Sequence, residues 1–498
     1  MHTNHRPHIT ILLLFAPFLL LAQPPSITFK AAGGQGKTIS VSRPLDGIYF
    51  GPNSTQDTLD KTGMFTIPNN EKVAGAYEFL YKKIYRLYVR PGQSYTLTVD
   101  EADTTAPLKI MAADREGQLF LNGLSFDFYQ SKGSRLYKAD TIFAHNKEQV
   151  LAAAAKQLAP FHQLLAQGKI DKGFNSYATR LVNNYQASVL ESTLITPMLK
   201  MFSWKDSTAY DAAKIKEMDA DWQEIITFVN PQDPVNRSVN TYGDYTFVYD
   251  QFYLGYFLPL RNGILVKASN DPDEFWTSPY KTIQQFYPEP LKEYLTASWI
   301  FFAAMQQEFQ PFILDWRRDF VLHYPNSIYY TAMLVASVDK VKDYQEKIRK
   351  TSSPAQRFLD HYDTITHFDE LAARFKGKTI YMDLWATWCG PCKQEFTYNE
   401  SLRSFLQSKG IEILYLSVDN QAADGKWKDM IKYYDLQGYH VRASDSLLQD
   451  IYKIFGKGPR HTLSIPRYAL IKDGEMVLAE AKSPDEGTAL YQQLAGFL

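Results

Sequence analysis

The sequence predicts a multidomain protein in which a β-sandwich-like N-terminal domain, an α-helical middle region and a C-terminal α/β domain follow one another. Three patterns indicate this order. Short runs of alternating apolar and polar residues fill residues 23–125, stretches with helical periodicity fill 126–350, and strands alternate with helices in 351–498. Residues 1–22 precede these segments and have the pattern of a targeting sequence.

The composition is that of an ordinary globular protein. Hydrophobic residues make up 45% and charged residues 21% of the chain, which argues against disorder. Lys and Arg number 53 and Asp and Glu number 54, so the net charge is -1. This balance gives no electrostatic reason to expect nucleic acid or an anionic membrane as a partner, and we expect neither.

The first 22 residues predict a secretory signal peptide. A polar head with His and Arg precedes the apolar run Ile9–Leu21, and the segment ends at Ala22. At 13 residues the run is shorter than the roughly 18 expected of a membrane-spanning helix. An uncleaved N-terminal anchor is the alternative. We expect a secreted protein, periplasmic if the source is a Gram-negative bacterium.

The β-rich domain is predicted from its alternating runs and from the turns between them. The runs are Thr38–Ser42, Met64–Ile67, Ile84–Val89 and Tyr95–Val99. Turn residues such as Pro91-Gly92 separate them. The segment Ala31–Thr38 fits a relaxed phosphate-loop pattern, but a strand-like run follows it where a phosphate loop needs a helix. We therefore expect a glycine-rich turn and no nucleotide site.

The middle region is predicted to be helical from four long periodic stretches, Lys147–Gln167, Tyr177–Phe202, Ala212–Val229 and Glu289–Leu322. Aromatic residues are dense here and could form a peptide-binding surface. Because aromatic stripes at helical spacing are more often buried, a core role is the favoured interpretation. These residues are Phe252, Tyr253, Tyr256, Phe257, Trp276, Tyr280, Phe286, Tyr287, Trp299, Phe301 and Phe302.

A linker at Thr351–Pro354 leads into the α/β domain. Predicted strands and helices alternate up to a hairpin turn at Asp473-Gly474 and a final helix. The predicted strands are 380–385, 411–418, 467–471 and 476–479, and the predicted helices before the last begin at Pro391 and span 426–434 and 446–455. Parallel strands joined by helices and closed by an antiparallel hairpin form such a layered domain.

The only two cysteines, Cys389 and Cys392, lie between the predicted strand at Ile380–Trp385 and the helix that Pro391 begins. A Cys-x-x-Cys pair in this position indicates redox chemistry, because a helix N-terminus lowers the pKa of the first thiol and the second lies within disulfide reach. The pair could instead be half of a zinc site. Tetrahedral zinc needs four ligands and no second cysteine pair exists, so we expect no metal.

This segment resembles the thioredoxin superfamily, and in particular the secreted thiol:disulfide oxidoreductases of the TlpA/ResA-like kind. The resemblance covers roughly residues 352–498. Three further positions match it: the buried acid Asp383 on the strand before Cys389, Ile465-Pro466 as the cis-proline that faces the cysteines, and Glu395 as an acid typical of the ResA-like branch. The family's helix often has a proline after that acid, and Thr397 stands there instead.

The resemblance implies a role for each matching residue. Cys389 is the nucleophile, Cys392 resolves the mixed disulfide, and Asp383 handles the Cys392 proton, while Glu395 is either a further site residue or an ordinary surface acid. The residues implied in substrate binding are Trp388, Gly390, Pro391, Ile465 and Pro466. No cofactor beyond the Cys389-Cys392 disulfide is implied. A β domain like 23–125 precedes the thioredoxin domain in many TlpA-like proteins.

The sequence therefore predicts an enzyme that exchanges thiols and disulfides with protein substrates. The Gly390-Pro391 dipeptide is that of reducing thioredoxins, so we expect a reductase recharged by a membrane electron donor. Lys393 and the loop residues Lys457, Arg460, His461 and Arg467 would oppose this direction if they approached Cys389, but a solvated basic loop is the favoured interpretation. Two alternatives are a binding protein that uses the domain as a scaffold and a thiol peroxidase. The peroxidase would need an activating Thr and Arg, and Thr387 alone does not provide them.

Overall fold

The computed structural model describes residues 24–497 except 101, 104–106, 203–211, 265–272, 307–308 and 459–461, so the predicted signal peptide 1–22 lies outside the described residues. The chain divides into two compact units. One comprises Met1–Trp299 and Tyr324–Met333, and the other comprises Ile300–His323 and Leu334–Leu498.

The first unit begins with two four-stranded sheets. One sheet has the order β4-β1-β7-β8 and the other β3-β2-β5-β6. All pairs are antiparallel except β1 with β7. The strands are β1 Ser26–Ala31, β2 Thr38–Ser42, β3 Ser54–Thr58, β4 Met64–Pro68, β5 Gly75–Tyr81, β6 Lys83–Val89, β7 Tyr95–Val99 and β8 Leu108–Met111. All four runs predicted from alternation are strands, whereas β1, β3, β5 and β8 were not predicted.

Buried side chains from both sheets form one core. It includes Phe29 of β1, Phe79 of β5 and Leu87 of β6, and the rings of Phe29 and Phe79 stack at 5.6 Å. The glycine-rich segment before Thr38 is a turn between β1 and β2, and β2 is a strand, so the expected absence of a phosphate-loop helix is confirmed.

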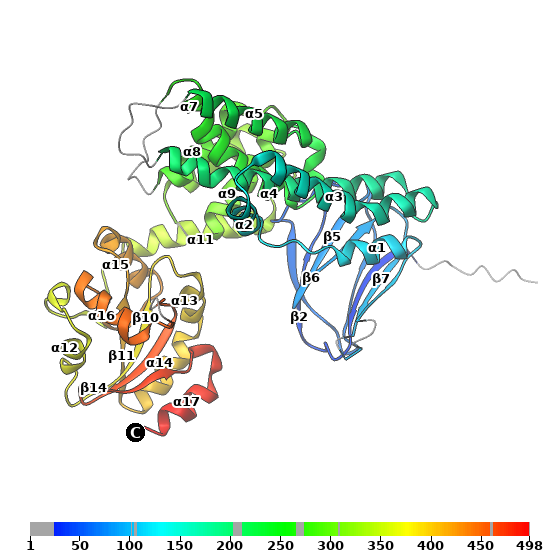
Figure 1. Ribbon diagram of the computed structural model, residues 1–498. Helices are drawn as coiled ribbons and strands as arrows, with labels where there is room; N and C mark the ends of the chain where they lie inside the picture. Colours follow the sequence, from blue (N-terminus) through cyan, green and yellow to red (C-terminus); the bar gives the residue numbers. More distant parts are fainter. Residues whose placement is uncertain are drawn as a thin grey trace, which may run out of the picture. The chain divides into compact units, whose positions relative to one another are not determined.

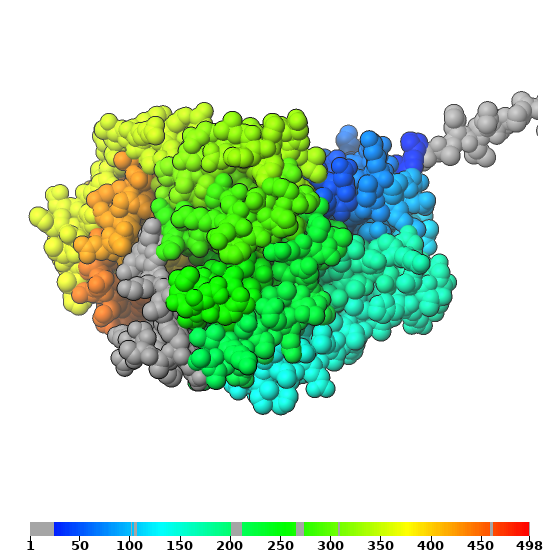
Figure 2. All heavy atoms as spheres, turned by 90° about the horizontal axis from the view of Figure 1, so that it is seen from above, coloured from blue at the N-terminus to red at the C-terminus, as the bar shows by residue number. Residues whose placement is uncertain are grey.

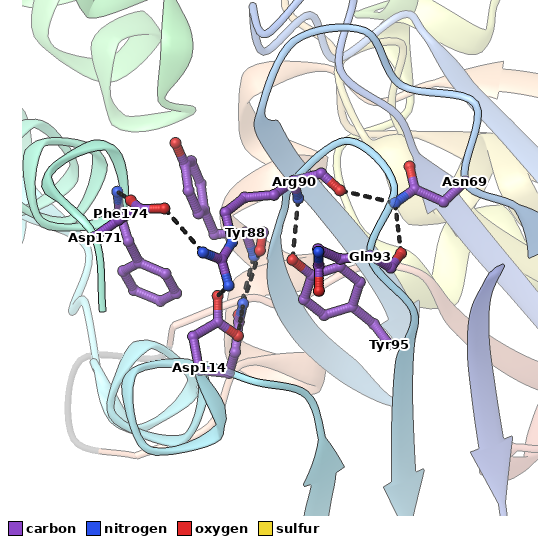
Figure 3. A network of polar contacts seen from close by, with 9 residues as sticks. Asn69, Tyr88, Arg90, Gln93, Tyr95, Asp114, Asp171 and Phe174 are labelled. Atoms are coloured by element: carbon purple, nitrogen blue, oxygen red, sulfur yellow. Dashed lines mark hydrogen bonds and ion pairs between the residues drawn. The ribbon is translucent and has the colours of Figure 1, made fainter. Parts of the chain in front are cut away.

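A polar network ties the loop after β6 to the helices that follow the sheets (Figure 3). Arg90 pairs with Asp114 at 3.2 Å and with Asp171 at 3.0 Å. The Asn69 side chain donates to the carbonyls of Arg90 and Gln93. These contacts give the segment Val89–Gln93 a structural role, because they fix both the loop and its neighbouring helices.

The rest of the first unit is helical, and in Figure 2 the blue strands lie beside the cyan and teal helices that follow them. The helices that begin in this unit are α1 Arg115–Gly123, α2 Tyr129–Ala139, α3 Phe143–Ala166, α4 Lys172–Phe202, α5 Ala212–Phe228, η1 Pro234–Ser238, α6 Thr241–Val248, the π-helix η2 Tyr249–Phe257, α7 Leu258–Arg261, α8 Glu274–Phe286 and α9 Leu291–Met305. Three of the four predicted stretches match α3, α4 and α5. The fourth, Glu289–Leu322, contains two helices, because α9 ends at Met305 and α10 begins at Phe312.

The aromatic residues of this region mostly form core. Tyr253, Phe257, Trp276, Tyr287 and Trp299 are buried. Of the aromatic residues named above, Tyr256 is exposed, at 38%, and the others are half-buried. The burial supports the core interpretation over a peptide-binding surface.

The second unit contains a six-stranded sheet with the order β14-β13-β10-β11-β12-β9 (Figure 1). Strands β10, β11, β12 and β9 are parallel to their neighbours in this order, while β13 runs antiparallel to β10 and β14 antiparallel to β13. The strands are β9 Gln356–Phe358, β10 Thr379–Trp385, β11 Ile411–Ser417, β12 Gly438–Arg442, β13 Arg467–Lys472 and β14 Glu475–Ala481. The predicted α/β architecture is confirmed, although β9 and β12 were missed.

Helices pair with one another beside this sheet. Phe405 of α14 stacks on Tyr491 of α17 at 4.2 Å, and Phe368 of α12 meets Phe455 of α16 edge-on. Asp473 and Gly474 both have positive φ, as a tight hairpin turn requires. The helices are α12 Phe368–Ala373, α13 Gly390–Glu395, η4 Phe396–Tyr398, α14 Asn399–Ser408, α15 Asp424–Tyr433, α16 Asp445–Phe455 and α17 Thr488–Ala495, with short turns at η3 Tyr362–Thr364, η5 Gln421–Ala423 and η6 Pro484–Glu486.

The same unit includes α10 Phe312–His323 and most of α11 Ala332–Ile348. Tyr344 of α11 stacks on Phe309 at 4.6 Å, and both rings contact Tyr433 at the end of α15. The Lys432 ammonium donates to the Ile348 carbonyl. These contacts attach α11 to the α/β sheet through α15.

Within the described ranges, no helix combines the length and the apolar character needed to cross a membrane.

Candidate active site

The site begins on β10, the strand between parallel β11 and antiparallel β13. Every residue of β10 after Thr379 is buried, and Asp383 is only 3% exposed. Burial disfavours the carboxylate and raises the pKa of Asp383 well above its usual value, and the charge of Glu395 raises it further. Asp383 is therefore the buried acid expected from the sequence.

Cys389 and Cys392 lie at the start of α13 and form a disulfide, with their Cα atoms 5.4 Å apart. Cys389 is the N-cap residue, and the backbone N–H of Cys392 points at the Cys389 sulfur, 3.1 Å away. In the reduced protein such an N–H and the helix N-terminus favour a thiolate at Cys389. Both cysteines are buried, whereas Trp388 beside them is 65% exposed.

The helix after the cysteines changes geometry although no proline interrupts it. One 3₁₀ turn, η4, separates α13 from α14, and Thr397 lies inside this turn. The Thr397 hydroxyl donates to the Gln394 carbonyl at 2.7 Å. The helix is therefore irregular here even though Thr397 replaces the proline that is common in the resembled family.

A second buried acid, Asp419, holds the loop before Cys389. Its carboxylate accepts the Thr387 backbone N–H at 2.9 Å, the Thr387 hydroxyl at 2.8 Å and the Ser417 hydroxyl at 2.7 Å. Sequence reasoning missed Asp419. The available signal was its place two residues after the parallel strand β11, because the carboxyl ends of parallel strands meet at one edge of a sheet.

The peptide bond between Ile465 and Pro466 is cis, as predicted. Arg467 pairs with Leu384 across the sheet, so Pro466 lies at the end of β10 from which the Cys389 segment leaves. Ile465 and Pro466 are half-buried, while Gly390 and Pro391 are exposed. The substrate-binding residues expected from the sequence are thus at the same edge of the sheet.

Glu395 is half-buried at the end of α13, where its Oε2 atom accepts the Asp485 backbone N–H at 3.1 Å. Burial raises the pKa of Glu395. It lines a pocket of about 320 Å³ together with Pro466, Arg467, Tyr468, Glu480, Ala481, Ser483 and Glu486. Glu395 thus lines the same pocket as Pro466, and its role in the reaction stays a prediction.

Two of the basic residues near the site are already paired. Lys457 and Arg467 both contact the Glu480 carboxylate, at 3.0 and 3.3 Å. Arg460 and His461 lie outside the described residues. Among the residues the structure describes, no three potential metal ligands of the His, Cys, Asp or Glu type come together.

The comparisons with known proteins agree with this geometry. The family model described as Redoxin matches residues 368–493. These residues form a redoxin domain.

The relatives include the thiol-disulfide oxidoreductase ResA of Bacillus thuringiensis subsp. konkukian, 33% identical over 103 residues, which are 21% of this chain and 54% of the relative. The ResA of Oceanobacillus iheyensis is 27% identical over 173 residues, 34% of this chain and 82% of the relative. Among solved structures, the thioredoxin domain of a thiol-disulfide oxidoreductase from Bacteroides vulgatus is 21% identical and covers 25% of this chain and 81% of its own, with a TM-score of 0.21. The chain thus spans about half the length of the first curated relatives it matches.

Proposed function

We propose that this chain is a thiol:disulfide oxidoreductase that reduces disulfides of protein substrates through the dithiol of Cys389 and Cys392. The observation that carries the proposal is that the only two cysteines of the chain form a disulfide at a helix N-terminus beside a buried carboxyl group. The names of the ResA relatives support the same chemistry.

The reaction has two steps. The Cys389 thiolate attacks one sulfur of the substrate disulfide, which forms a mixed disulfide and releases the other substrate sulfur as a thiolate. Cys392 then loses its proton and attacks the Cys389 sulfur, which closes the Cys389-Cys392 disulfide and releases the remaining substrate thiolate. The substrate gains two electrons and the enzyme loses two.

Asp383 accepts the Cys392 proton in the second step. An ordinary aspartate is too weak a base for a thiol, but burial and the Glu395 charge raise the Asp383 pKa, so its carboxylate binds a proton more tightly. No cofactor other than the disulfide takes part, and no metal is involved.

Trp388, Gly390, Pro391, Ile465 and Pro466 contact the substrate in this proposal. An exposed Trp388 offers an apolar surface next to Cys389. The Ile465 backbone can pair with an extended substrate segment, as a strand edge does.

Location, partners and domain limits are part of the same proposal. The protein is secreted through a signal peptide at 1–22, is periplasmic in a Gram-negative source, and receives electrons from a membrane protein. Its domains are a β-sandwich at 23–125, a helical region at 126–350 and the thioredoxin-like domain at 351–498. The two four-stranded sheets that share one core support the first of these limits.

Reduction of insulin by dithiothreitol tests the activity. The wild type should accelerate the reaction and Cys389→Ser should not, whereas a domain that is only a scaffold would leave the rate at background. A Cys392→Ser variant should accumulate mixed disulfides and so identify the natural substrates.

Equilibration with glutathione tests the direction. A reductase should have a potential near the thioredoxin value of about -270 mV, far below the value of about -120 mV for a strong oxidant. In its ionised form the buried Asp383 supports the lower value, because its negative charge destabilises the thiolate form of the pair. A potential above about -180 mV would overturn the assignment as a reductase.

A further inference from the structure

Two tyrosines flank Asp383 on the neighbouring strands. Asp383 of β10 lies opposite Tyr415 of β11 and opposite Tyr468 of β13. Directly opposed residues project from the same face of a sheet, so both phenol rings lie on the side of the sheet from which Asp383 projects. Burial raises the pKa of each tyrosine, and the charge of the Asp383 carboxyl group raises it further.

Polar atoms of all three residues are buried without a partner. The Oδ1 atom of Asp383 and the hydroxyls of Tyr415 and Tyr468 have no hydrogen-bond partner among the described residues. A buried polar group left unpaired costs about 1 to 3 kcal/mol, so three at one place require a reason. Two explanations account for such unpaired polar atoms: a water molecule bound among them, or a role of the three groups in proton transfer.

Tyr468 and Tyr415 differ in their access to the pocket beside the site, and this difference favours Tyr468 for a role in proton transfer. Tyr468 lines the pocket of about 320 Å³ that Glu395 and Pro466 also line, and Tyr415 does not. Both Asp383 and Glu395 act electrostatically on Tyr468. Tyr468 therefore stands between the buried acid and a pocket that opens to solvent.

We propose that the Tyr468 hydroxyl links Asp383 to the Glu395 pocket and passes the Asp383 proton to solvent. The proposal rests on the proposed function, because the proton in question is the one that Cys392 gives up. After that transfer Asp383 carries the proton. Because the Tyr468 hydroxyl is buried and is not hydrogen-bonded to Asp383, the proton moves to the Tyr468 oxygen through one water. The Tyr468 hydroxyl proton moves through a second water towards the pocket, and no bond between heavier atoms changes.

The groups that face Asp383 come from four elements. They are Tyr381 of its own strand, Tyr415 of β11, Tyr468 of β13 and Glu395 of α13, the helix that also carries Cys392. The Tyr381 hydroxyl already donates to the Lys482 carbonyl at 2.9 Å, and its ring stacks on Tyr468 at 5.6 Å. Of the three tyrosines, only Tyr468 combines an unpaired hydroxyl with the pocket.

Tyr468→Phe removes one oxygen and keeps the ring. Resolution of a preformed mixed disulfide should slow about tenfold, less than the 10²- to 10⁴-fold of a directly acting acid or base. The first attack by Cys389 should keep its rate. Titration of the Asp383 carboxyl in the reduced protein, followed by its infrared band, should shift relative to the wild type, which a merely structural tyrosine would not cause.

Tyr381→Phe is the matched control, since it deletes a neighbouring hydroxyl that is already paired. It should leave the Asp383 titration and the resolution rate unchanged. Glu395→Gln tests the pocket end of the path and should slow the same step as Tyr468→Phe. Equal behaviour of Tyr468→Phe and the wild type in both measurements, or an equal effect of Tyr381→Phe, overturns the proposal.

The infrared titration separates this proposal from the proposed function because it needs no substrate. If the wild type failed to accelerate insulin reduction while Tyr468→Phe still shifted the Asp383 titration, the activity would be wrong and the link would stand. If the wild type were active and Tyr468→Phe matched it in both measurements, only the link would be wrong.

Discussion

Two regions of this molecule each bury carboxyl groups with strongly raised pKa values, the redoxin domain at Asp383 and the helical region at Glu191 and Asp250. Glu191 is fully buried in α4, and neither of its carboxyl oxygens has a hydrogen-bond partner among the described residues. Asp250 is buried in the π-helix η2, where the Tyr287 hydroxyl donates to it at 2.5 Å. Burial raises the pKa of Asp250 to about 8 and that of Glu191 well above its usual range.

The two regions share the cause of the pKa shift and differ in their neighbours. Asp383 lies on the strand before the helix that carries the Cys389-Cys392 disulfide, and two residues coupled to it electrostatically, Glu395 and Tyr468, line a pocket. The electrostatic neighbours of Glu191 and Asp250 include Tyr245 and Tyr249, which are buried core tyrosines whose pKa values are raised chiefly by burial and further by these acids. A raised pKa therefore reports burial, and chemistry depends on what lies beside the buried group.

The largest expected contrast is between Cys389→Ser and Glu191→Gln. Loss of the nucleophile should lower insulin reductase activity about 10³-fold or more, to background. Glu191→Gln replaces a neutral buried acid by a neutral amide in the other region and should leave turnover within about twofold of the wild type, since α4 contributes no reacting group. Single-turnover and steady-state rates measure both. A large loss of activity in Glu191→Gln with an intact fold would show that the helical region takes part in catalysis.

Stability should depend on pH through Asp250. Its pKa in the folded protein is about 8, above the ordinary value of 3.8. The folded state therefore binds the Asp250 proton more tightly than the unfolded state, and this contribution to the free energy of unfolding is complete below pH 3.8 and is lost as pH rises towards 8. Across this window Asp250 should lower the free energy of unfolding by about 1.4 kcal/mol per pH unit. Urea unfolding of the wild type and Asp250→Asn measures the slope, and the variant should show a smaller one.

Asp127→Asn is the control for this measurement, because the Asp127 side chain is 64% exposed. It should leave the slope unchanged. A wild-type stability that stays constant from acid to neutral pH would contradict the burial of an uncharged Asp250.

In the redoxin domain the corresponding change, Asp383→Asn, should alter the rate of a reaction step, the resolution of the mixed disulfide. The amide cannot accept the Cys392 proton, so resolution of the mixed disulfide should slow by about 10²-fold while the first attack is little changed. Rapid-mixing experiments with a labelled substrate separate the two steps. Equal slowing of both steps, or of neither, would remove Asp383 from proton transfer.

The sequence was sufficient for the parts of the site that are contiguous in the chain. Cys389, Cys392 and Asp383 lie within one strand, loop and helix, and local patterns place them correctly. The cis bond before Pro466 was also predicted, although from the family resemblance rather than from a local pattern.

The parts that sequence reasoning missed depend on pairing between distant segments. Asp419 reaches Thr387 from 32 positions away, and Tyr468 reaches Asp383 only through the register of β13 on β10. Glu191 gave no signal, because a glutamate in a long helix is normally solvated and only the packing of α4 against neighbouring helices buries it. Strand register and helix packing are properties of the assembled chain, so no local window contains them.

The smallest expected effect compares a proline from each region. Pro466→Thr adds a backbone N–H and a branched side chain where Ile465 is proposed to pair with substrate, and loss of about one hydrogen bond, near 1 kcal/mol, should raise KM about fivefold with kcat nearly constant. Pro290→Thr makes the same chemical change at an exposed residue before α9 and should leave KM unaltered. Steady-state kinetics with a disulfide peptide measure both variants. If Pro466→Thr kept the wild-type KM, substrate would dock elsewhere on the domain. If both substitutions raised KM equally, the effect would come from a general loss of folded protein rather than from the edge of the sheet beside Cys389.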